Sequence, residues 1–352
     1  MIDEELCLGE RMPKPTTDAS SSWRKLFKAA DVFRDGEPWN VLDGDRELFA
    51  VVDSATGKTF YCCVIGSGGE VFGLIAYRGE AGYSIHYKMH HSELPPELNP
   101  DLGLEQDCLM AEFVYRNELS ASDKRIIKVL GLKYRGFGYP RFRNFVPSLY
   151  PEELNEAEAE TLTDCLEVGA IVCDFVLADK KYLRKKGHIR TWSRSSEGTW
   201  LDAWVKAPVV ENVIPDTNSN ELRIASLKKL NLKPAGAWEA GVVAFPGRVP
   251  TGDGRFFIPR LCVVADHESG FVFSHRLLDP SADVSLSLLN ALLDAIKSSG
   301  YLPKEILVQE EATARFLLPT LTELNIEIYE QPLLPAIFNM RQEMGAHFNA
   351  ER

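Results

Sequence analysis

The fold of this chain is decided by a short hairpin signal, Leu48-Phe49-Ala50-Val51-Val52-Asp53-Ser54-Ala55-Thr56-Gly57-Lys58-Thr59-Phe60-Tyr61-Cys62-Cys63-Val64-Ile65. The apolar runs at its two ends have the composition of strands, and the Asp-Ser-Ala-Thr-Gly between them is typical of a turn. A second turn at 66–69 leads into another apolar run at 71–77. The stretch therefore predicts three strands in quick succession.

Helices and strands alternate on both sides of this hairpin. An amphipathic helix is expected from Trp23, with Ser22 as its N-cap, because apolar residues recur there at helical spacing. After the third strand we expect a helix at 82–93, a strand at 108–116, a helix ending at Gly131, a strand at 141–146, a long helix at 152–183 and a hairpin at 189–204.

The second half of the chain repeats this order. Strands are expected at 238–245, 260–265, 271–277, 306–309 and 326–329, and helices at 284–298, 312–324 and 334–344. Both halves therefore have the order βββαβαβα, which is the order of elements in ribonuclease H-like folds. The sequence predicts an α/β protein with mixed sheets, built as two successive ribonuclease H-like units.

The domain boundaries follow from turn and loop composition. Residues 1–21 are polar and contain Pro13 and Pro15, which predicts a disordered tail. A linker is expected at 208–220, where Pro215-Asp216-Thr217-Asn218-Ser219-Asn220 is rich in loop residues. The N-terminal domain is then 22–207 and the C-terminal domain 221–346.

Composition and charge limit the function classes. The 352 residues carry a formal net charge of −12, so nucleic acid is an unfavourable partner unless a local basic patch overrides this field. An apolar leader and a membrane-spanning run are not expected, and the predicted location is the cytoplasm. The seven cysteines form no CxxC pair, which favours reduced thiols over disulfides or a zinc ribbon.

A ribonuclease H-like fold raises the question of a two-metal carboxylate site. The first half offers Asp53, Glu118 and Asp164. The second half offers Glu310, Glu311 and Glu343, with Glu239 near the start of its first strand and Asp266 on its second. Neither set is complete, and Asp53 also fits a plain turn role. The weak catalytic candidates are Asp53, Asp266, Glu310 and Glu311.

A basic and aromatic segment is the best candidate contact surface. Arg135-Gly136-Phe137-Gly138-Tyr139-Pro140-Arg141-Phe142 nearly matches the strand of RNA-recognition motifs on which bases stack. Pro140 removes a ladder donor from what should be a central strand, and this favours a packed Gly/Pro loop instead. The candidate binding residues are Arg135, Tyr139, Arg141, Phe142 and Arg143.

One histidine pair has the spacing of metal ligands on a helix. His86 and His90 lie one helical turn apart, with His91 adjacent, but the sequence indicates no third ligand. A solvated or packed helix face is the prediction, and neither a metal nor a cofactor is expected.

The chain also resembles a family of bacterial proteins that pair two uncharacterised domains in this order. The resemblance lies in Trp23-Arg24-Lys25-Leu26-Phe27, Phe49-Ala50-Val51-Val52-Asp53, Gly69-Glu70-Val71-Phe72-Gly73-Leu74 and Tyr77-Arg78-Gly79, and in the segment 260–277. It supports the division into two domains and implies no chemistry.

Two classes of function stay open on these grounds. The first is a non-catalytic binding or scaffold protein of the bacterial cytoplasm that holds a protein or a small ligand. The second is a metal-dependent nuclease or phosphoryl-transfer enzyme that uses one ribonuclease H-like half. The incomplete acid sets and the net charge of −12 favour the first.

Overall fold

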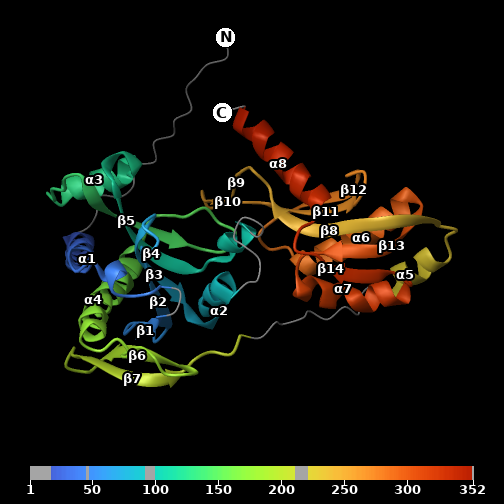
Figure 1. Cartoon of the computed structure of the whole chain (residues 1–352). Coiled ribbons are helices and arrows are strands. Elements are labelled where there is room, and N and C mark those ends of the chain that lie inside the picture. The colour runs from blue at the N-terminus through green and yellow to red at the C-terminus, as the bar shows by residue number, and fades with distance from the viewer. Residues whose placement is uncertain (1–16, 45–46, 92–99, 211–220, 351–352) are drawn as a thin grey trace, which may run out of the picture. The chain divides into compact units, whose positions relative to one another are not determined.

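The chain folds as two compact units whose segments interleave along the sequence. The structure, a computed structural model, describes residues 17–44, 47–91, 100–210 and 221–350. The first unit takes in residues up to 83, then 107–145 and 151–208; the second takes in 84–106, 146–150 and the chain from 209 onward. Figure 1 labels their helices and strands.

The first helix begins earlier than the sequence predicts. Helix α1 spans Thr17–Asp35, so Ser22 lies inside it rather than at its N-cap, and residues 17–21 of the predicted tail are helical. The Ser22 hydroxyl donates a hydrogen bond to Glu160 at 2.9 Å, which gives this side chain a tertiary partner in place of a cap. Residues 1–16 of the predicted tail and 211–220 of the predicted linker lie outside the described residues.

The first unit contains a seven-stranded sheet with the order β5-β4-β3-β2-β1-β6-β7. Its strands are β1 Phe49–Val52, β2 Thr59–Ile65, β3 Phe72–Arg78, β4 Cys108–Tyr115, β5 Phe137–Phe145, β6 His188–Arg194 and β7 Trp200–Lys206. Each of β1 to β5 is antiparallel to the next, whereas β6 lies parallel to β1 and antiparallel to β7. The sheet is therefore mixed.

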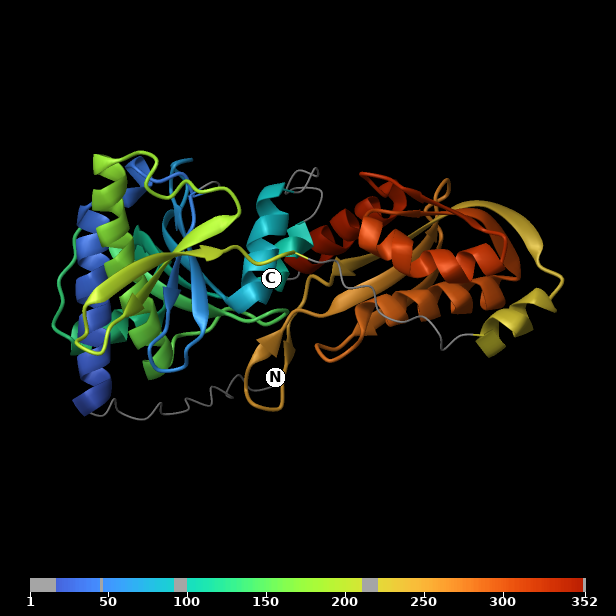
Figure 2. The ribbon, with the colours of Figure 1, turned by 90° about the horizontal axis from the view of Figure 1, so that it is seen from below.

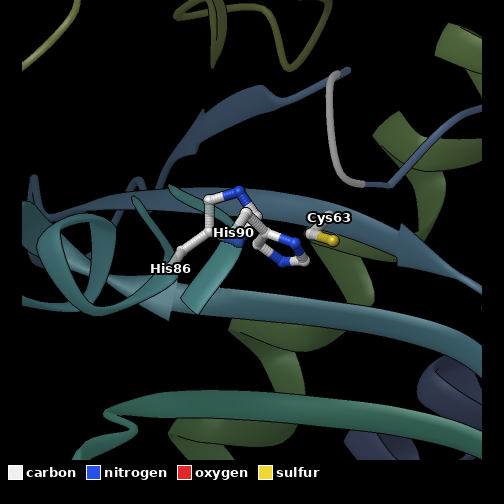
Figure 3. Close-up of side chains that lie close together, drawn as sticks. All are labelled: Cys63, His86 and His90. Carbon is white, nitrogen blue, oxygen red and sulfur yellow. The ribbon is translucent and has the colours of Figure 1, made fainter. Parts of the chain in front are cut away.

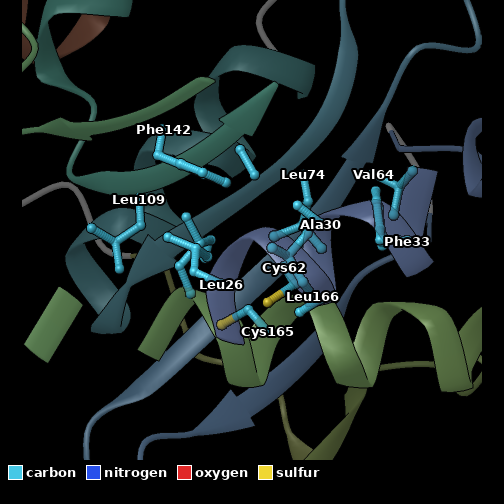
Figure 4. Packing of buried hydrophobic residues seen from close by; sticks show 14 of the residues in the cluster. Leu26, Ala30, Phe33, Cys62, Val64, Leu74, Leu109, Phe142, Cys165 and Leu166 are labelled. Atoms are coloured by element: carbon cyan, nitrogen blue, oxygen red, sulfur yellow. The ribbon is translucent and has the colours of Figure 1, made fainter. Parts of the chain in front are cut away.

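Two helices cover one face of this sheet. Helices α1 and α4 (Glu156–Ala178) lie side by side (Figure 2) and share a core with β2 to β5. Figure 4 shows this packing from close by, with Leu26 and Ala30 of α1, Cys62 of β2 and Leu166 of α4 in one cluster. The long apolar helix is thus a core element.

The opposite face carries a smaller core. Tyr61 and Cys63 of β2 lie in it with Tyr77 of β3, and Tyr83 of helix α2 (Gly79–His91) packs against them. Adjacent Cys62 and Cys63 therefore point to opposite faces, as the period of two in a strand predicts. Helix α3 (Ala121–Val129) has Ser120 as its N-cap.

The second unit is built on a five-stranded sheet with the order β12-β11-β8-β13-β14. Its strands are β8 Lys233–Ala244, β11 Arg260–Asp266, β12 Val272–Leu278, β13 Tyr301–Val308 and β14 Glu327–Glu330. Strands β8, β11 and β12 are antiparallel neighbours, and β13 lies parallel to both β8 and β14. Strands β9 Val249–Pro250 and β10 Phe256–Phe257 form a separate two-stranded antiparallel sheet.

Helices cover both faces of this second sheet. Helices α5 (Glu221–Lys228), α6 (Val284–Ser299) and α7 (Glu311–Glu323) share the larger core with one face. Helix α8 (Pro335–Ala350) lies on the other face (Figure 1) and packs through Ala336 and Ile337. The unit is an α/β/α sandwich.

The predicted order βββαβαβα is confirmed, but only the second unit also pairs its strands as ribonuclease H-like folds do. There β13, the fourth predicted strand, lies parallel to the first, β8. In the first unit the fourth strand, β4, instead pairs antiparallel with β3. The strand that lies parallel to β1 there is β6. An order of elements does not specify which edges meet, so the two sheets differ.

The chain contains no helix in its described part that is long and apolar enough to cross a membrane.

Gly73 allows β3 and β4 to approach closely. A Cβ atom at this position would lie 2.1 Å from the Ala111 carbonyl oxygen of β4, which is backbone and cannot turn aside. Gly73→Ala is therefore expected to destabilise the first unit by about 1–3 kcal/mol, the usual cost of overpacking. Urea denaturation followed by tryptophan fluorescence measures this loss.

Gly236→Ala is the matched control, because Gly236 also lies in a strand and nothing stands within 4 Å of the position that an alanine Cβ would occupy there. We expect a change of about 0.5 kcal/mol or less. Equal losses from both substitutions would show that the β3–β4 approach does not require glycine.

Candidate functional site

The acids offered by the first unit are each held by local or helix-to-strand contacts. Asp53 follows β1 and accepts a hydrogen bond at 3.0 Å from the Thr56 backbone N–H in the turn. Glu118 accepts one at 2.7 Å from the Tyr115 N–H. Asp164 of α4 accepts one at 2.7 Å from Arg194. Burial raises the pKa of Asp164, and the bond from Arg194 only partly offsets this rise.

The acids offered by the second unit lie on different elements. Asp266 ends β11 and accepts hydrogen bonds from the backbone and hydroxyl of Ser269, at 2.8 and 2.7 Å. Glu310 is the N-cap residue of α7, Glu311 follows it and pairs with Arg315, and Glu343 is exposed on α8. Across both units, no three carboxylates of the described residues come within 4.8 Å of one another.

Glu239 on β8 has a role that the sequence did not suggest. Its side chain is fully buried, and its carboxylate accepts hydrogen bonds from the backbone N–H groups of Ala336 and Ile337, at 3.1 and 2.9 Å. His267 Nδ1 lies 2.7 Å from the same carboxylate. These N–H groups belong to the first turn of α8, where a negative charge is favoured. Glu239 therefore anchors α8 to the sheet.

The basic and aromatic segment lies on β5 and the loop before it. Tyr139 and Phe142 are buried in the core, and their rings pack against Tyr134 and Phe27. β5 is an edge strand, so the missing N–H of Pro140 does not interrupt a ladder on both sides.

The arginines of this segment divide into paired and exposed ones. Arg141 pairs with Glu112 at 2.7 Å, and Arg143 pairs with Asp123 at 2.7 Å. Arg135 is exposed. Of the five candidate binding residues, the structure therefore places four in packing or ion pairs on β5, and they do not form one exposed surface with Arg135.

A cavity of about 240 Å³ lies in the second unit. Strand β13 pairs with β8 up to Leu307 opposite Glu239, and β8 continues beyond that pair to Ala244. The cavity opens where β13 ends and where helices α6, α7 and α8 begin. Its lining residues are Asp101, Leu102, Leu104, Glu105, Ala240, Gly241, Val242, Val243, Arg260, Val284, Ser285, Leu288, Gln309, Glu310, Ala312, Thr313, Leu333, Leu334, Ile337, Phe338 and Arg341.

Four of the five charged residues of this cavity form two ion pairs across its wall, Arg341 with Asp101 and Arg260 with Glu105. Asp101 belongs to the short helix η2 (Pro100–Glu105); it accepts bonds from Arg341 and from the Ala244 N–H, both at 2.7 Å. Arg260 pairs with Glu105 and also donates to Ser148 Oγ at 3.0 Å. These contacts hold η2 against the sheet, so part of the cavity wall comes from a segment far away in the sequence.

A second cluster gathers a thiol and two imidazoles. Cys63, His86 and His90 bring Sγ and one ring nitrogen each to within 4.8 Å of one another (Figure 3). Burial, with the neighbouring imidazoles of His90 and His91, lowers the pKa of His86 to about 3, so His86 is neutral at physiological pH. The sequence did not indicate the third member of this cluster because Cys63 lies more than twenty positions upstream of His86.

Comparison with protein families identifies two domains. Residues 23–194 match the family described as Domain of unknown function (DUF7309), and residues 223–345 match the Domain of unknown function (DUF6930). The chain thus carries these two domains in this order, which confirms the resemblance to a two-domain family of unknown activity. No curated protein matches the chain.

Among solved structures, similar chains come from viral integrases. The HTLV-2 integrase catalytic core domain in complex with magnesium matches in its trimeric form at 19% identity, with a TM-score of 0.24 over 31% of this chain and 66% of that one. Its dimeric form matches at 20% identity, with a TM-score of 0.22, and the match covers 28% of this chain and 62% of that chain. The simian T-cell lymphotropic virus intasome in complex with the PP2A regulatory subunit B56 gamma matches at 19% identity, with a TM-score of 0.22. This match covers 29% of this chain and 36% of that chain.

The Arg143–Asp123 pair should contribute stability that depends on pH. Burial works to raise the pKa of Asp123, but hydrogen bonds from Arg143 and Ser120 outweigh it and lower the pKa below its ordinary value. The stabilisation is therefore fully present above the ordinary Asp pKa of about 4. It is lost as the pH falls through the lowered pKa that Asp123 has in the folded protein. We expect Arg143→Ala to cost about 1.5–3 kcal/mol at pH 7.

Urea denaturation of wild type and variant at pH 7 and at successively lower pH checks this expectation. The difference between them should shrink at acid pH, and the exposed Arg135→Ala control should change stability by about 0.5 kcal/mol or less. A loss for Arg143→Ala that does not vary with pH would contradict the assigned ion pair.

Proposed function

We propose that this protein is a non-catalytic binding protein of the bacterial cytoplasm, and that its second unit binds a small ligand in the cavity at the end of β13. The observation that carries the proposal is the cavity itself. It combines an apolar wall with a few polar groups in one concave site, as small-molecule sites do. In open α/β sheets, ligands bind outside the carboxyl ends of strands, which is where this cavity lies.

The size and lining of the cavity indicate the class of ligand. A volume of about 240 Å³ is smaller than the roughly 300–1,000 Å³ of drug-sized sites, so the ligand is small. Val243, Leu288 and Ile337 contribute apolar surface, whereas Gln309 and Thr313 contribute polar groups. The ligand therefore has an apolar body and one polar end.

The charges around the cavity favour a cationic or uncharged polar end. Three carboxylates, Asp101, Glu105 and Glu310, stand against two guanidinium groups, Arg260 and Arg341. Both arginines already pair with acids of the wall. Glu310 is exposed at the start of α7 and is placed to meet a cation.

Filling the cavity should abolish binding. Phenethylamine and phenylacetate are matched probes that differ in the charge of the polar end, and we expect phenethylamine to raise the melting temperature more. A ligand that binds only the folded state stabilises it by about 2.7 kcal/mol at 100 times its Kd. Ser285→Phe places a ring into the cavity from α6 and should remove this rise, which a thermal-shift titration measures.

Ser287→Phe is the matched control, because it lies on the same helix and does not line the cavity. It should leave the phenethylamine effect in place. A rise that survives Ser285→Phe, or wild-type protein that responds to neither probe, would be evidence against the proposed site.

The alternative, a metal-dependent nuclease or phosphoryl-transfer enzyme, has less support. Two-metal chemistry needs carboxylates that converge on a pair of cations. The described residues contain no cluster of three carboxylates, and the acids of the second unit are used in a turn, at a helix start and in the anchoring of α8.

A titration with Mg²⁺ and Mn²⁺ separates the two functions. We expect no rise in melting temperature at millimolar metal for wild type, Asp53→Ala or Asp266→Ala, since any bound cation would stabilise the folded state. A rise in wild type that one of these variants loses would locate a carboxylate site and favour the enzyme.

A further inference from the structure

The cluster of Cys63, His86 and His90 is built by one continuous stretch of chain, β2–β3–α2. Helix α2 starts directly after β3, at Gly79, whose φ of 58° allows the sharp change of direction. The division between the two compact units falls inside this helix, which is continuous. Tyr83 in its second turn packs against Tyr61 of β2, with ring centroids 5.0 Å apart. The helix is thus fixed beside the strand that carries Cys63.

The two histidines face the same side of α2. Residues four apart on a helix are neighbours, and the His86 and His90 ring centroids lie 4.3 Å apart. Cys63 and His86 are 1% and 3% exposed, whereas His90 is exposed. The cluster therefore has a buried side, formed by Cys63 and His86, and an open side at His90.

The distances fit a small metal ion. In a tetrahedral zinc site with Zn–S of about 2.3 Å and Zn–N of about 2.0–2.1 Å, ligand atoms lie roughly 3.3–3.6 Å apart. The three ligand atoms here are within 4.8 Å of one another, so shifts of roughly 1 Å would bring them to these separations.

We propose that Cys63, His86 and His90 bind one Zn²⁺ through a sulfur and two nitrogens, with the fourth position open on the exposed His90 side. A thiolate with imidazoles selects zinc over magnesium or calcium, which prefer oxygen ligands. Three protein ligands and an open fourth position are the arrangement of zinc sites that take up water or another small ligand.

Binding is a proton-releasing exchange without a redox change. The Cys63 thiol donates to the Gly44 carbonyl at 3.1 Å, and zinc takes the place of that proton as the thiol becomes a thiolate. The proton goes to solvent, and the bond to Gly44 is lost.

Zinc and cobalt titrations of the full chain test the proposal, independently of the cavity in the second unit. Metal-free protein is titrated with Zn²⁺ against a chromophoric chelator, and with Co²⁺ while its absorption is recorded. We expect one zinc per chain, visible bands of tetrahedral cobalt, and a thiolate-to-cobalt charge-transfer band in the near ultraviolet.

Variants assign the metal to these residues. His90→Ala removes an exposed ligand and should weaken zinc binding at least about 100-fold, since losing even an outer partner of a ligand costs 10–100-fold. Cys63→Ala should remove the charge-transfer band. His91→Ala is the control: its ring stacks on Tyr87 at 4.0 Å, outside the cluster, and binding should be unchanged.

Circular dichroism checks that each variant is folded. If Cys63→Ala, which alters a buried residue, does not fold, the exposed His90→Ala still tests the proposal. Wild-type protein that retains no zinc would overturn the proposal. So would equal zinc affinity in His90→Ala and His91→Ala, because the metal would then be held elsewhere.

Discussion

Each unit depends on the parallel strand that pairs with its first strand, β6 beside β1 in the first unit and β13 beside β8 in the second. Parallel neighbours cannot be joined by a tight turn, so the chain must cross over a face of the sheet between them. That crossover buries apolar helices: α4 in the first unit and α6 in the second. The cores of both units follow from this requirement.

The same constraint creates the cavity of the second unit. Because β13 stops pairing at Leu307 while β8 continues, a recess forms where the helices that begin beside it cannot fill the space. Such a recess is concave, and the sheet sets the backbone along one side of it. A binding site at this place needs only side-chain changes to suit a ligand, without a change of fold.

Buried polar groups hold the parts of the second unit that the sheet does not. Glu239, fully buried, accepts two backbone hydrogen bonds from the start of α8, and Asp101 receives Arg341 from the same helix. A buried carboxylate without these donors would be strongly unfavourable. Glu239 thus positions helix α8, and Asp101 positions the segment η2.

Features that depend on neighbours along the chain could be predicted from the sequence. The turn at Asp53, the opposite orientation of Cys62 and Cys63, and the order βββαβαβα of both halves all follow from local spacing and composition. The start of α1 did not, because Ser22 meets Glu160 of α4 instead of capping its own helix. Long-range partners override local signals of that kind.

Which strands pair and which side chains come together depends on the packing of the whole chain. Pro140 is tolerated because β5 lies at the edge of the sheet, and an order of elements does not reveal an edge. Cys63 joins His86 and His90, and η2 lines a cavity beside β8, through contacts between segments that are distant in sequence. Such contacts are set by the packing of whole elements, which local periodicity does not encode.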